Sequence, residues 1–417
     1  MTPVGETSLQ VCNPKNGEVV SVDFIVVKNS FSCLLSLSAV RTLNLITVND
    51  NNFIANIAKD ADLGNLGTVT LHIDSNIEPR ALLCRRVPLT REGKLKTTLN
   101  SLVQRGVLSV VDEPTDFVSQ MAIVEKADHS LHICIDPQVL NRALKREHFR
   151  LPTLDDVLPK LRKANVFSKC DASSAFWHVK LDEPSRKLTT MITPFGRYYW
   201  NRLPFGLKVS SEIFQKRLTA ALSGLHGAFA IADDLLIAGS GDTMADAERD
   251  HPHNLQQLKE CCKAKHIKLN AKKVVEKNTH LSFMGYIIMP GGVKPDPVKV
   301  AAILQMPPPQ DIPGVKRLCG MVQYLAKFLP NLANDLTPLR NLTRNGVPWE
   351  WTAECERAFH TVKQKMTNAP VLAYYNPDDK LTLQADSSKD DIAAVLLQQG
   401  KNLPLVLSLL LSVTGRK

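Results

Sequence analysis

The sequence predicts a mixed α/β (α+β) fold in several pieces, and three observations carry that prediction. The chain has 417 residues, 44% of them apolar and 22% charged, so at about 150 residues per domain it allows two to three domains with real cores. Between residues 122 and 242, strand-like apolar runs alternate with helix-like stretches. From Lys294 the pattern changes to helices joined by proline-rich connectors such as Pro307-Pro308-Pro309.

The first 90 residues divide into a strand-rich part and a weakly patterned connector. Residues 1–48 contain short strands, of which Val19–Val27 is the clearest, and then a helix near Ser38–Leu43. Residues 49–90 are polar and lack a clear period, so we expect a linker there. A helix follows over Arg91–Arg105.

Further elements follow from period and composition along the rest of the chain. The expected strands are Gly106–Val111, Met121–Glu125, His132–Ile135, Val166–Asp171, Phe229–Ile237 (as a hairpin) and Leu381–Ala385, which is followed by the segment Ile392–Gln398. The expected helices are Leu154–Lys163, Ser211–Leu222, Asp246–Lys268, 314–328 and 352–368. Because proline interrupts the helical hydrogen-bond ladder, Pro252 must lie in the first turn of its helix or kink it.

The charge of the chain favours a polyanionic partner. Basic residues outnumber acidic ones 51 to 41, for a net charge of +10. The first 90 residues hold 7 Lys or Arg and 8 Asp or Glu, which leaves 44 against 33 beyond them. The positive field therefore belongs to the later three quarters of the chain, where nucleic acid is a plausible partner. A moderately basic enzyme with no such partner is the alternative that charge alone leaves open.

Cysteine usage and apolar runs argue against a secreted or membrane protein. The nine cysteines are scattered and form no CxxC pair, so neither a zinc site nor a disulfide framework is indicated. The first residues lack the basic start and apolar core of a secretory signal. The longest apolar run, residues 403–413, has about half the length that a bilayer requires. We expect a cytoplasmic or nuclear protein with free thiols.

Three carboxylates stand out by their position. Asp171 ends an apolar strand, and Asp233-Asp234 lies between two apolar arms that read as a β-hairpin with the acidic pair at its tight turn. Like charges placed together disfavour ionisation, whereas bound Mg²⁺ prefers such hard oxygen ligands. Two ions about 3.5–4 Å apart can activate a hydroxyl and stabilise a leaving phosphate. Taken alone, the dipeptide is better explained by an Asx-type turn, and Asp171 by an ordinary strand end.

A family resemblance rests on five blocks that occur in order along the chain. The blocks are LPTLDDVLPKLRKANVFSKCDASSAFWHVKLDEPSRKLTTMITPFGRYYWNRLPFGL, GAFAIADDLLIAG, HLSFMGYIIMPGGVKPDPVKVAAI, GVKRLCGMVQYLAKFLPNL and WEWTAECERAFHTVKQKMTNAPVLAYYNPDDKLTLQADSS. They resemble the reverse transcriptases of gypsy-type LTR retrotransposons and retroviruses over nearly the whole chain. The resemblance implies a right-hand polymerase with fingers and palm over 91–290, a thumb and connection over 291–345, and a ribonuclease H-like domain over 346–417.

The resemblance also implies a catalytic centre. Asp171 matches the first palm aspartate, and Ile231-Ala232-Asp233-Asp234 matches the hairpin box that usually begins with Tyr. By this likeness Asp171 and Asp233 hold two Mg²⁺ ions, and Asp234 supports the site.

The same likeness implies residues for the incoming nucleotide and the primer. Phe176 matches the aromatic residue that excludes the ribose 2′-OH, and Phe205-Gly206 belongs to the loop that packs beneath the nucleotide. Lys126 lies near the fingers lysine that faces the triphosphate. Met284-Gly285 looks like the hairpin that grips the primer terminus. Outside this frame, Phe176 reads as a core side chain and Lys126 as an exposed strand-end lysine.

Three positions depart from the family pattern. His132 and Gln138 stand where arginines are usual, and Ser211 stands where proline is usual. Histidine is mostly neutral at pH 7, so His132 cannot reproduce a bidentate phosphate contact. The departures indicate weakened nucleotide binding, or a drifting copy of the element.

The flanks resemble parts of neighbouring enzymes. Residues 1–48 resemble the C-terminal part of a retropepsin-like protease without its catalytic Asp-Thr/Ser-Gly, so we expect no proteolysis. Asp386 matches the first carboxylate of ribonuclease H, whose other acidic residues lie downstream in the family. After Gln399 the likeness ends, and we expect an out-of-frame tail in a truncated domain.

These observations give one leading function and two rivals. The leading hypothesis is an RNA-directed DNA polymerase that uses an RNA or DNA template with a primer, dNTPs and two Mg²⁺ ions. The first rival is a decayed or co-opted copy that binds nucleic acid without extending it, and the second is a chain that does not fold. Nothing in the sequence indicates an oligomeric state or a membrane partner.

Overall fold

The computed structural model describes residues 3–12, 19–27, 63–126, 128–329, 331–376, 378–387, 392–400 and 403–407. The chain forms two compact units, Met1–Lys59 and Asp60–Lys417. In the described part of the first unit, β1 (Pro3–Cys12) and β2 (Val19–Val27) pair as an antiparallel hairpin. The strand predicted over Val19–Val27 is therefore confirmed, and the helix expected near Ser38–Leu43 lies outside the described residues.

Residues 63–88 of the second unit are packed, although the sequence predicts a linker there. Leu63, Leu66 and Leu71 are buried, and β3 (Thr68–Val69) pairs in parallel with β8 (Lys180–Leu181). The apolar residues of this segment do not recur at a regular spacing, because they pack one by one against distant elements and do not form one continuous face.

A five-stranded sheet and its helices form the first part of the second unit. Its strand order is β4-β10-β9-β5-β6, made of β4 (Leu108–Val110), β10 (Gly196–Trp200), β9 (Met191–Thr193), β5 (Ser119–Glu125) and β6 (Leu131–Asp136). The associated helices are α3 (Leu89–Gln104), α4 (Gln138–Ala143) and α6 (Glu183–Leu188). Helix α3 buries three apolar side chains at helical spacing, Leu95, Leu99 and Leu102. Burial of each such side chain contributes about 1.5–3 kcal/mol to the free energy of folding.

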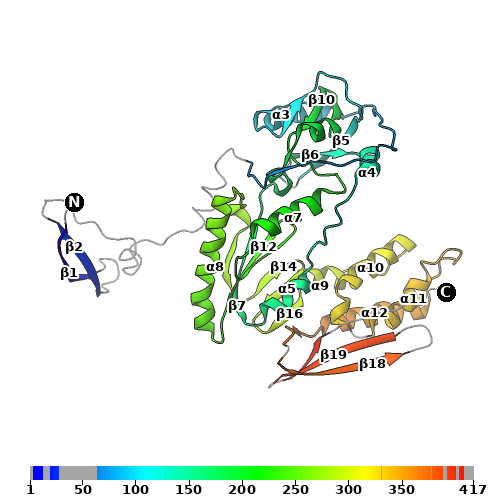
Figure 1. The fold of residues 1–417 in the computed structure, drawn as a ribbon. Coiled ribbons are helices and arrows are strands. Elements are labelled where there is room, and N and C mark those ends of the chain that lie inside the picture. The colour runs from blue at the N-terminus through cyan, green and yellow to red at the C-terminus, as the bar shows by residue number, and fades with distance from the viewer. Residues whose placement is uncertain are drawn as a thin grey trace. The chain divides into compact units, whose positions relative to one another are not determined.

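A second, central sheet positions the carboxylates. Its order is β11-β12-β7-β13, made of β11 (Ala228–Ile231), β12 (Asp234–Ser240), β7 (Ala164–Asp171) and β13 (Val275–Asn278). Figure 1 shows α8 (Met244–Ala264) running along β7 and β12, and both strands contact it. The helix α7 (Ser210–Ala221) contacts β11 and also η2 (Ala175–His178).

Two helix predictions differ from the structure near prolines. The helix expected over Leu154–Lys163 is a short α5 (Leu154–Val157) followed by a 3₁₀ turn, η1 (Leu158–Leu161), because Pro159 cannot continue the α-helical hydrogen bonds. In contrast, α8 continues through Pro252 well beyond its first turn. Its N-terminus is fixed by a capping box between Thr243 and Asp246.

The remaining elements share one core with the central sheet. They are the sheet β14 (Leu281–Phe283), β15 (Tyr286–Met289), β16 (Gly292–Pro295) and β17 (Leu372–Ala373), the helices α9 (Pro297–Leu304), α10 (Ile312–Tyr324), α11 (Leu332–Asn341) and α12 (Ala353–Thr367), and the short η4 (Ala326–Phe328). The short η3 (Ala271–Lys273) contacts β7. Phe167 and Leu236 of the central sheet belong to the same buried cluster as Phe283, Leu318 and Phe359. This continuous core links the strand ends to the helices that follow them.

A three-stranded antiparallel sheet ends the described chain. It consists of β18 (Lys380–Ser387), β19 (Ile392–Gly400) and β20 (Leu403–Leu407) in that order, and Figure 1 shows β18 and β19 as paired arrows in orange and red. Among the residues described, no helix has the length and apolar character needed to cross a membrane.

Candidate active site

The ends of two neighbouring strands bring the three predicted carboxylates to one edge of the central sheet. Asp171 is the last residue of β7 and Asp234 is the first of β12, and the two are direct partners in the antiparallel register. Asp233 precedes Asp234, and its carbonyl accepts a 2.7 Å hydrogen bond from the Ala172 N–H. Because such cross-strand partners lie only about 5 Å apart, the three residues form one acidic cluster.

Two lysines neutralise part of this acidic cluster. The Lys273 ammonium lies 2.7 Å from a carboxylate oxygen of Asp171, whose side chain is only 9% exposed. The Lys169 ammonium lies 3.1 Å from Asp234. Burial raises the pKa of Asp234, and the nearby carboxylates add to this effect while Lys169 opposes it. The hydrogen bond to Asp171 raises the pKa of Lys273, so this lysine stays charged.

The carboxylates do not all face the same space. Asp171 and Asp233 line one cavity of about 1040 Å³, together with Lys273. Asp234 pairs instead with Lys169, whose ammonium lies 5.6 Å from the centre of the Phe283 ring. The two residues expected to hold metal therefore open to the cavity, while the expected supporting residue is held against the sheet.

The donor set fits Mg²⁺ in chemistry, although it is not arranged as a closed metal site. Carboxylate oxygens on two adjacent strand ends are the ligands that Mg²⁺ prefers. Within the described ranges, however, no group of three or more His, Cys, Asp or Glu side chains lies close enough to hold a metal ion. Lys273 supplies the positive charge at Asp171, so the burial of this carboxylate is already compensated.

The hairpin turn is Ala232-Asp233, one residue earlier than the acidic pair predicted for it. Ile231 and Asp234 are the last paired residues on the two arms. Ala232 has a φ of +54°, which is uncommon for a residue with a side chain and is seen most often at functional sites and tight turns. The shift places Asp233 at the exposed tip and makes Asp234 part of β12.

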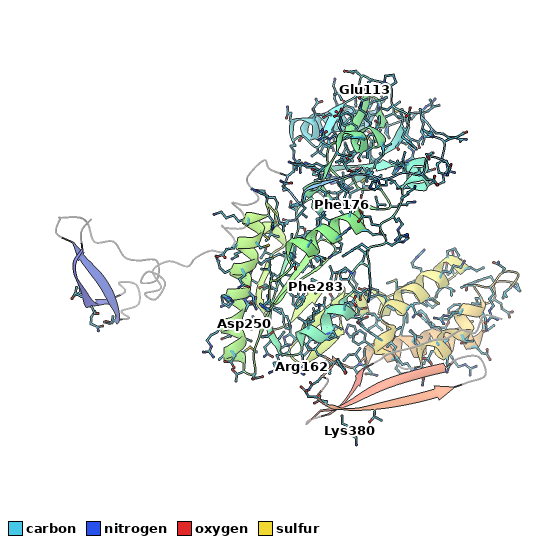
Figure 2. The ribbon with its side chains drawn as sticks, viewed as in Figure 1. Glu113, Arg162, Phe176, Asp250, Phe283 and Lys380 are labelled. Atoms are coloured by element: carbon cyan, nitrogen blue, oxygen red, sulfur yellow. The ribbon has the colours of Figure 1, made fainter. Side chains whose placement is uncertain are left out.

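An apolar cavity of about 290 Å³ adjoins the acidic edge. Phe176, labelled in Figure 2, lines it with Phe205 and Phe214, and Asp233 borders both this cavity and the larger one. The Phe176 ring centre lies 4.6 Å from that of Phe205 and 5.7 Å from that of Phe214. The aromatic residue predicted to contact the sugar thus lies within one group of tilted and edge-on aromatic rings next to a carboxylate.

The loop that carries Phe205 is fixed by the glycine after it. Gly206 has a φ of +113°, and a Cβ atom there would lie 2.0 Å from the carbonyl oxygen of Ile135 in β6. The Asn141 amide donates a 2.9 Å hydrogen bond to the Gly206 carbonyl. Only glycine allows this close approach, and the approach holds Phe205 over the cavity.

The larger cavity has a cationic wall in addition to its carboxylates. Lys126, which follows β5, lines it, as do Lys94 of α3 and Arg105, the residue that follows α3. Hydroxyl groups of α3, among them Thr97 and Ser101, lie between these cations. Cations and hydroxyl donors in one cavity with two carboxylates form a surface suited to a polyphosphate.

The three departures from the family pattern have different surroundings. His132 also lines the cationic cavity and packs edge-on against Phe205 at 4.8 Å. Burial, reinforced by Lys126, lowers the pKa of His132, so it is neutral at pH 7. Gln138 is the exposed first residue of α4. Ser211 lies in the first turn of α7 and borders the apolar cavity.

The predicted primer-contacting pair forms a tight turn held by a tyrosine. Met284 and Gly285 both have positive φ, +49° and +74°, between β14 and β15, as a type I′ hairpin turn requires. The Tyr324 hydroxyl of α10 donates a hydrogen bond to the Met284 carbonyl. The Tyr324 ring also stacks on Tyr286, with 5.2 Å between ring centres.

Asp386 lies far along the chain in β18, where its register partner is Ala393 of β19. Its side chain lies outside the described part of the structure. The prediction for this residue therefore rests on its place in the strand.

No strong pattern in the sequence marks Lys169, Lys273 or Gln215, although all three contact the acidic cluster or its turn. The lysines look like any surface lysine in the sequence. Gln215 carries a weak signal, because it interrupts the apolar positions Ile213, Phe214 and Leu218 of its helix. A buried polar residue needs partners there.

Known families match two parts of the chain. Residues 124–288, which contain all three clustered carboxylates, match the family described as reverse transcriptase (RNA-dependent DNA polymerase). Residues 351–410 match the RNase H-like domain found in reverse transcriptase. This chain carries a reverse transcriptase domain. The second match runs past Gln399, so the prediction that the family likeness ends there is wrong.

Curated relatives of the reverse transcriptase domain are polyproteins of retroelements and a plant virus. The retrovirus-related Pol polyprotein from transposon 412 of Drosophila melanogaster is 33% identical over 328 residues, covering 77% of this chain and 26% of the relative. The enzymatic polyprotein of Cauliflower mosaic virus (strain NY8153) is 30% identical over 65% of this chain and 40% of the relative. The chain thus spans about a quarter to two fifths of their length and corresponds to the reverse transcriptase region of a retroelement polyprotein.

Solved structures confirm the polymerase fold. A foamy viral protease-reverse transcriptase in complex with dsDNA superposes with a TM-score of 0.74 at 17% identity, covering 91% of this chain and 81% of that one. The same viral enzyme in complex with an RNA/DNA hybrid gives 0.71 at 16% identity, covering 100% and 61%.

Proposed function

We propose that this chain is an RNA-directed DNA polymerase from the pol polyprotein of a gypsy-type retrotransposon. It would add a dNTP to a primer 3′-OH on an RNA or DNA template, with release of pyrophosphate. The observation that carries the proposal is the position of Asp171 and Asp233, which open together onto a cationic cavity that adjoins an apolar one. The match of residues 124–288 to reverse transcriptases supports it.

The two adjoining cavities suit the two halves of a nucleotide. The aromatic group of Phe176, Phe205 and Phe214 would take the base and sugar. The wall of Lys94, Arg105 and Lys126 would take the triphosphate. Asp233 borders both cavities, so the α-phosphate would lie beside the carboxylates.

Asp171 and Asp233 would hold the two Mg²⁺ ions. When bound, the ions supply activation of the primer hydroxyl and stabilisation of the leaving phosphate. Lys169 keeps Asp234 engaged, so this carboxylate would shape the edge of the sheet and need not bind metal. Phe176 would exclude the 2′-OH of an rNTP by its bulk.

Template and primer would be held through their phosphates by basic surface, and the Met284-Gly285 turn would contact the primer end. The foamy viral protease-reverse transcriptases of similar fold are in complex with dsDNA and with an RNA/DNA hybrid, and this supports a duplex as the partner. In an A-form-like hybrid, shape and not sequence would be recognised.

We propose domain roles that follow the same likeness. Fingers and palm would span 91–290, thumb and connection 291–345, and the ribonuclease H-like part 346–417 with Asp386 as its first carboxylate. Residues 1–48 would be a retropepsin-like remnant, connected through 49–90. We place the chain in the cytoplasm or nucleus, where its cysteines stay reduced.

One observation favours a second function: the chain would be a decayed or co-opted copy that binds nucleic acid without extending a primer. His132 stands in the cationic cavity as a neutral ring packed against Phe205, so one triphosphate contact usual in the family is lost.

Primer extension on poly(rA)–oligo(dT) with Mg²⁺ and dTTP distinguishes the two functions. The parent chain is compared with Asp233→Asn and with Asp242→Asn, a matched control whose aspartate is 79% exposed and pairs with Lys163. Extension by the parent and the control, but not by Asp233→Asn, establishes the polymerase. Salt-sensitive binding of the duplex without extension establishes the second function.

A further inference from the structure

Gln215 is an almost fully buried polar side chain beside the acidic turn. It lies in α7 next to Phe214 and is only 1% exposed. A buried carboxamide is costly unless its donors and acceptor find partners. Gln215 forms three hydrogen bonds to neighbouring groups, and these fix the orientation of its carboxamide.

The partners of Gln215 are the backbone groups on both sides of Ile231. Its amide nitrogen donates to the Ala230 carbonyl at 3.0 Å, and its amide oxygen accepts from the Ala232 N–H at 2.7 Å. The nitrogen also donates to the Thr219 hydroxyl at 3.2 Å. A carbonyl can only accept and an N–H can only donate, so these backbone partners fix which end of the carboxamide faces which atom.

The backbone N–H that Gln215 binds belongs to Ala232, the residue with the strained backbone conformation. Ala232 has a φ of +54°, where a residue with a Cβ atom is disfavoured unless its surroundings enforce it. On the other side of the turn the Ala172 N–H binds the Asp233 carbonyl at 2.7 Å. The turn is therefore held from α7 at its first half and from Ala172, the residue that follows β7, at its second half.

We propose that Gln215 is a positioning residue for Asp233. By enforcing the left-handed conformation of Ala232, it directs Asp233 toward the cavity that Asp171 also lines. The inference rests on the proposed polymerase function, because a displacement of a catalytic group by about 1 Å can cost 10²-fold in rate. Gln215 acts through the turn and does not touch the reacting atoms.

The first test replaces the carboxamide by a side chain of similar size. Gln215→Met removes the hydrogen bonds and keeps the volume. In single-nucleotide incorporation we expect kcat to fall about 10- to 100-fold, which is about 1.4–2.7 kcal/mol, with KM for dTTP within about twofold. The control is Gln256→Met, at an exposed position of α8, which should match the parent. An unchanged kcat, or a raised KM at constant kcat, overturns the proposal.

A second substitution tests the link to the strained turn. Glycine adopts positive φ without penalty, so the double variant Gln215→Met/Ala232→Gly should recover part of the kcat lost by Gln215→Met alone. If the second substitution instead adds its own loss to the first, the turn conformation is not what Gln215 controls.

Gln215→Glu covers the case in which the methionine variant does not fold. A protonated carboxyl can donate to the Ala230 carbonyl and accept from Ala232, whereas a carboxylate cannot donate and repels Asp233. The ratio of its kcat to that of the parent should therefore rise as the pH falls. A pH-independent ratio contradicts the proposal.

Amide hydrogen exchange separates this inference from the proposed function. The Ala232 amide should be protected in the parent and lose protection in Gln215→Met, whether or not the chain extends primers. Equal exchange in both proteins overturns the inference. A parent that fails to extend primers while showing the protection overturns only the polymerase function.

Discussion

Asp171 and Asp234 face each other across neighbouring strands, yet each is held by a lysine from a different part of the chain. Lys273, in η3, reaches Asp171 at 2.7 Å, and Lys169, two residues before Asp171, reaches Asp234 at 3.1 Å. These contacts explain how an acidic cluster folds at neutral pH without an ion. The carboxylates could be anticipated from the apolar strand ends, but their lysine partners depend on tertiary pairing that no local pattern indicates.

Gly206→Ala should destabilise the protein more than a matched substitution at Gly196. Both glycines have a φ near +112°, but a Cβ at Gly206 meets the Ile135 carbonyl at 2.0 Å and one at Gly196 meets nothing within 4 Å. We expect a loss of about 1 kcal/mol for Gly196→Ala from backbone conformation, and about 2–4 kcal/mol for Gly206→Ala, which adds the clash. Urea denaturation measures both, and equal losses would contradict the packing of this loop.

The stability of the fold should fall on mild acidification because of His251. This ring is fully buried and lies 2.8 Å from the Ser168 hydroxyl. Burial, reinforced by Lys277 and Lys259 and opposed by Asp250, lowers its pKa from 6.5 to about 4. Below pH 6.5 the unfolded chain binds a proton that the folded chain does not, so stability falls between about pH 6.5 and 4, by up to about 3 kcal/mol.

The matched variants for this effect are His251→Gln and His253→Gln. His253 is exposed on the same helix, so its replacement should leave the pH dependence intact, whereas His251→Gln should flatten it. Denaturation curves from pH 7.5 to 4.5 provide the comparison. A parent chain with no slope in that range would show that His251 is not held neutral.

At the scale of elements, the acidic hairpin shows what a sequence pattern can and cannot specify. Two apolar arms around Asp233-Asp234 predict the hairpin, and β11 and β12 confirm it. The turn nevertheless falls on Ala232-Asp233, because the Ile231–Asp234 pair closes the ladder one residue earlier. Periodicity identifies the arms, but the register depends on the pairing of β12 with β7, which starts at Asp171.

The contact between α10 and the β14–β15 turn should increase the number of nucleotides added before the primer dissociates. Tyr324→Phe removes the hydrogen bond to the Met284 carbonyl and retains the stacking on Tyr286. We expect a stability loss of about 1 kcal/mol and shorter products per binding event in extension with a heparin trap. The matched control is Tyr374→Phe, which removes a hydroxyl bond to Met289 at the other end of β15.

The Tyr374→Phe control should lose similar stability without shortening the products. Equal product lengths for both variants would show that α10 does not position the turn. Shorter products for the Tyr324 variant alone would assign the effect to the Met284-Gly285 turn.

At the scale of the whole molecule, the sequence indicates the fold class but not how distant segments pack. The alternation of strands and helices between 122 and 242 predicts the α/β part, and the solved polymerase structures confirm that fold. Residues 63–88 escape prediction because their anchoring contacts join segments that are far apart in the chain. The pair β3 and β8, for example, lies more than 100 residues apart. The charge excess beyond residue 90 predicts a cationic cavity wall only in general terms.

Binding of a primer–template duplex should weaken steeply with salt. The net charge of +10 and the cationic wall favour phosphate contacts, and 6–10 such contacts would lower affinity about 10³- to 10⁵-fold between 50 and 200 mM salt. Fluorescence anisotropy with an RNA/DNA hybrid measures the slope. An affinity that does not change with salt would exclude phosphate-dominated binding.

The central claim is that Asp171 and Asp233 together carry nucleotide addition, and single-turnover incorporation of one dTMP opposite rA tests it most directly. The parent chain, Asp171→Asn, Asp233→Asn and the exposed control Asp242→Asn are compared with saturating dTTP and Mg²⁺. We predict product from the parent and the control, and rates at least about 10³-fold lower for the other two, because a site that loses a metal-binding carboxylate loses most of its electrostatic stabilisation. Undiminished incorporation by Asp233→Asn would contradict the account.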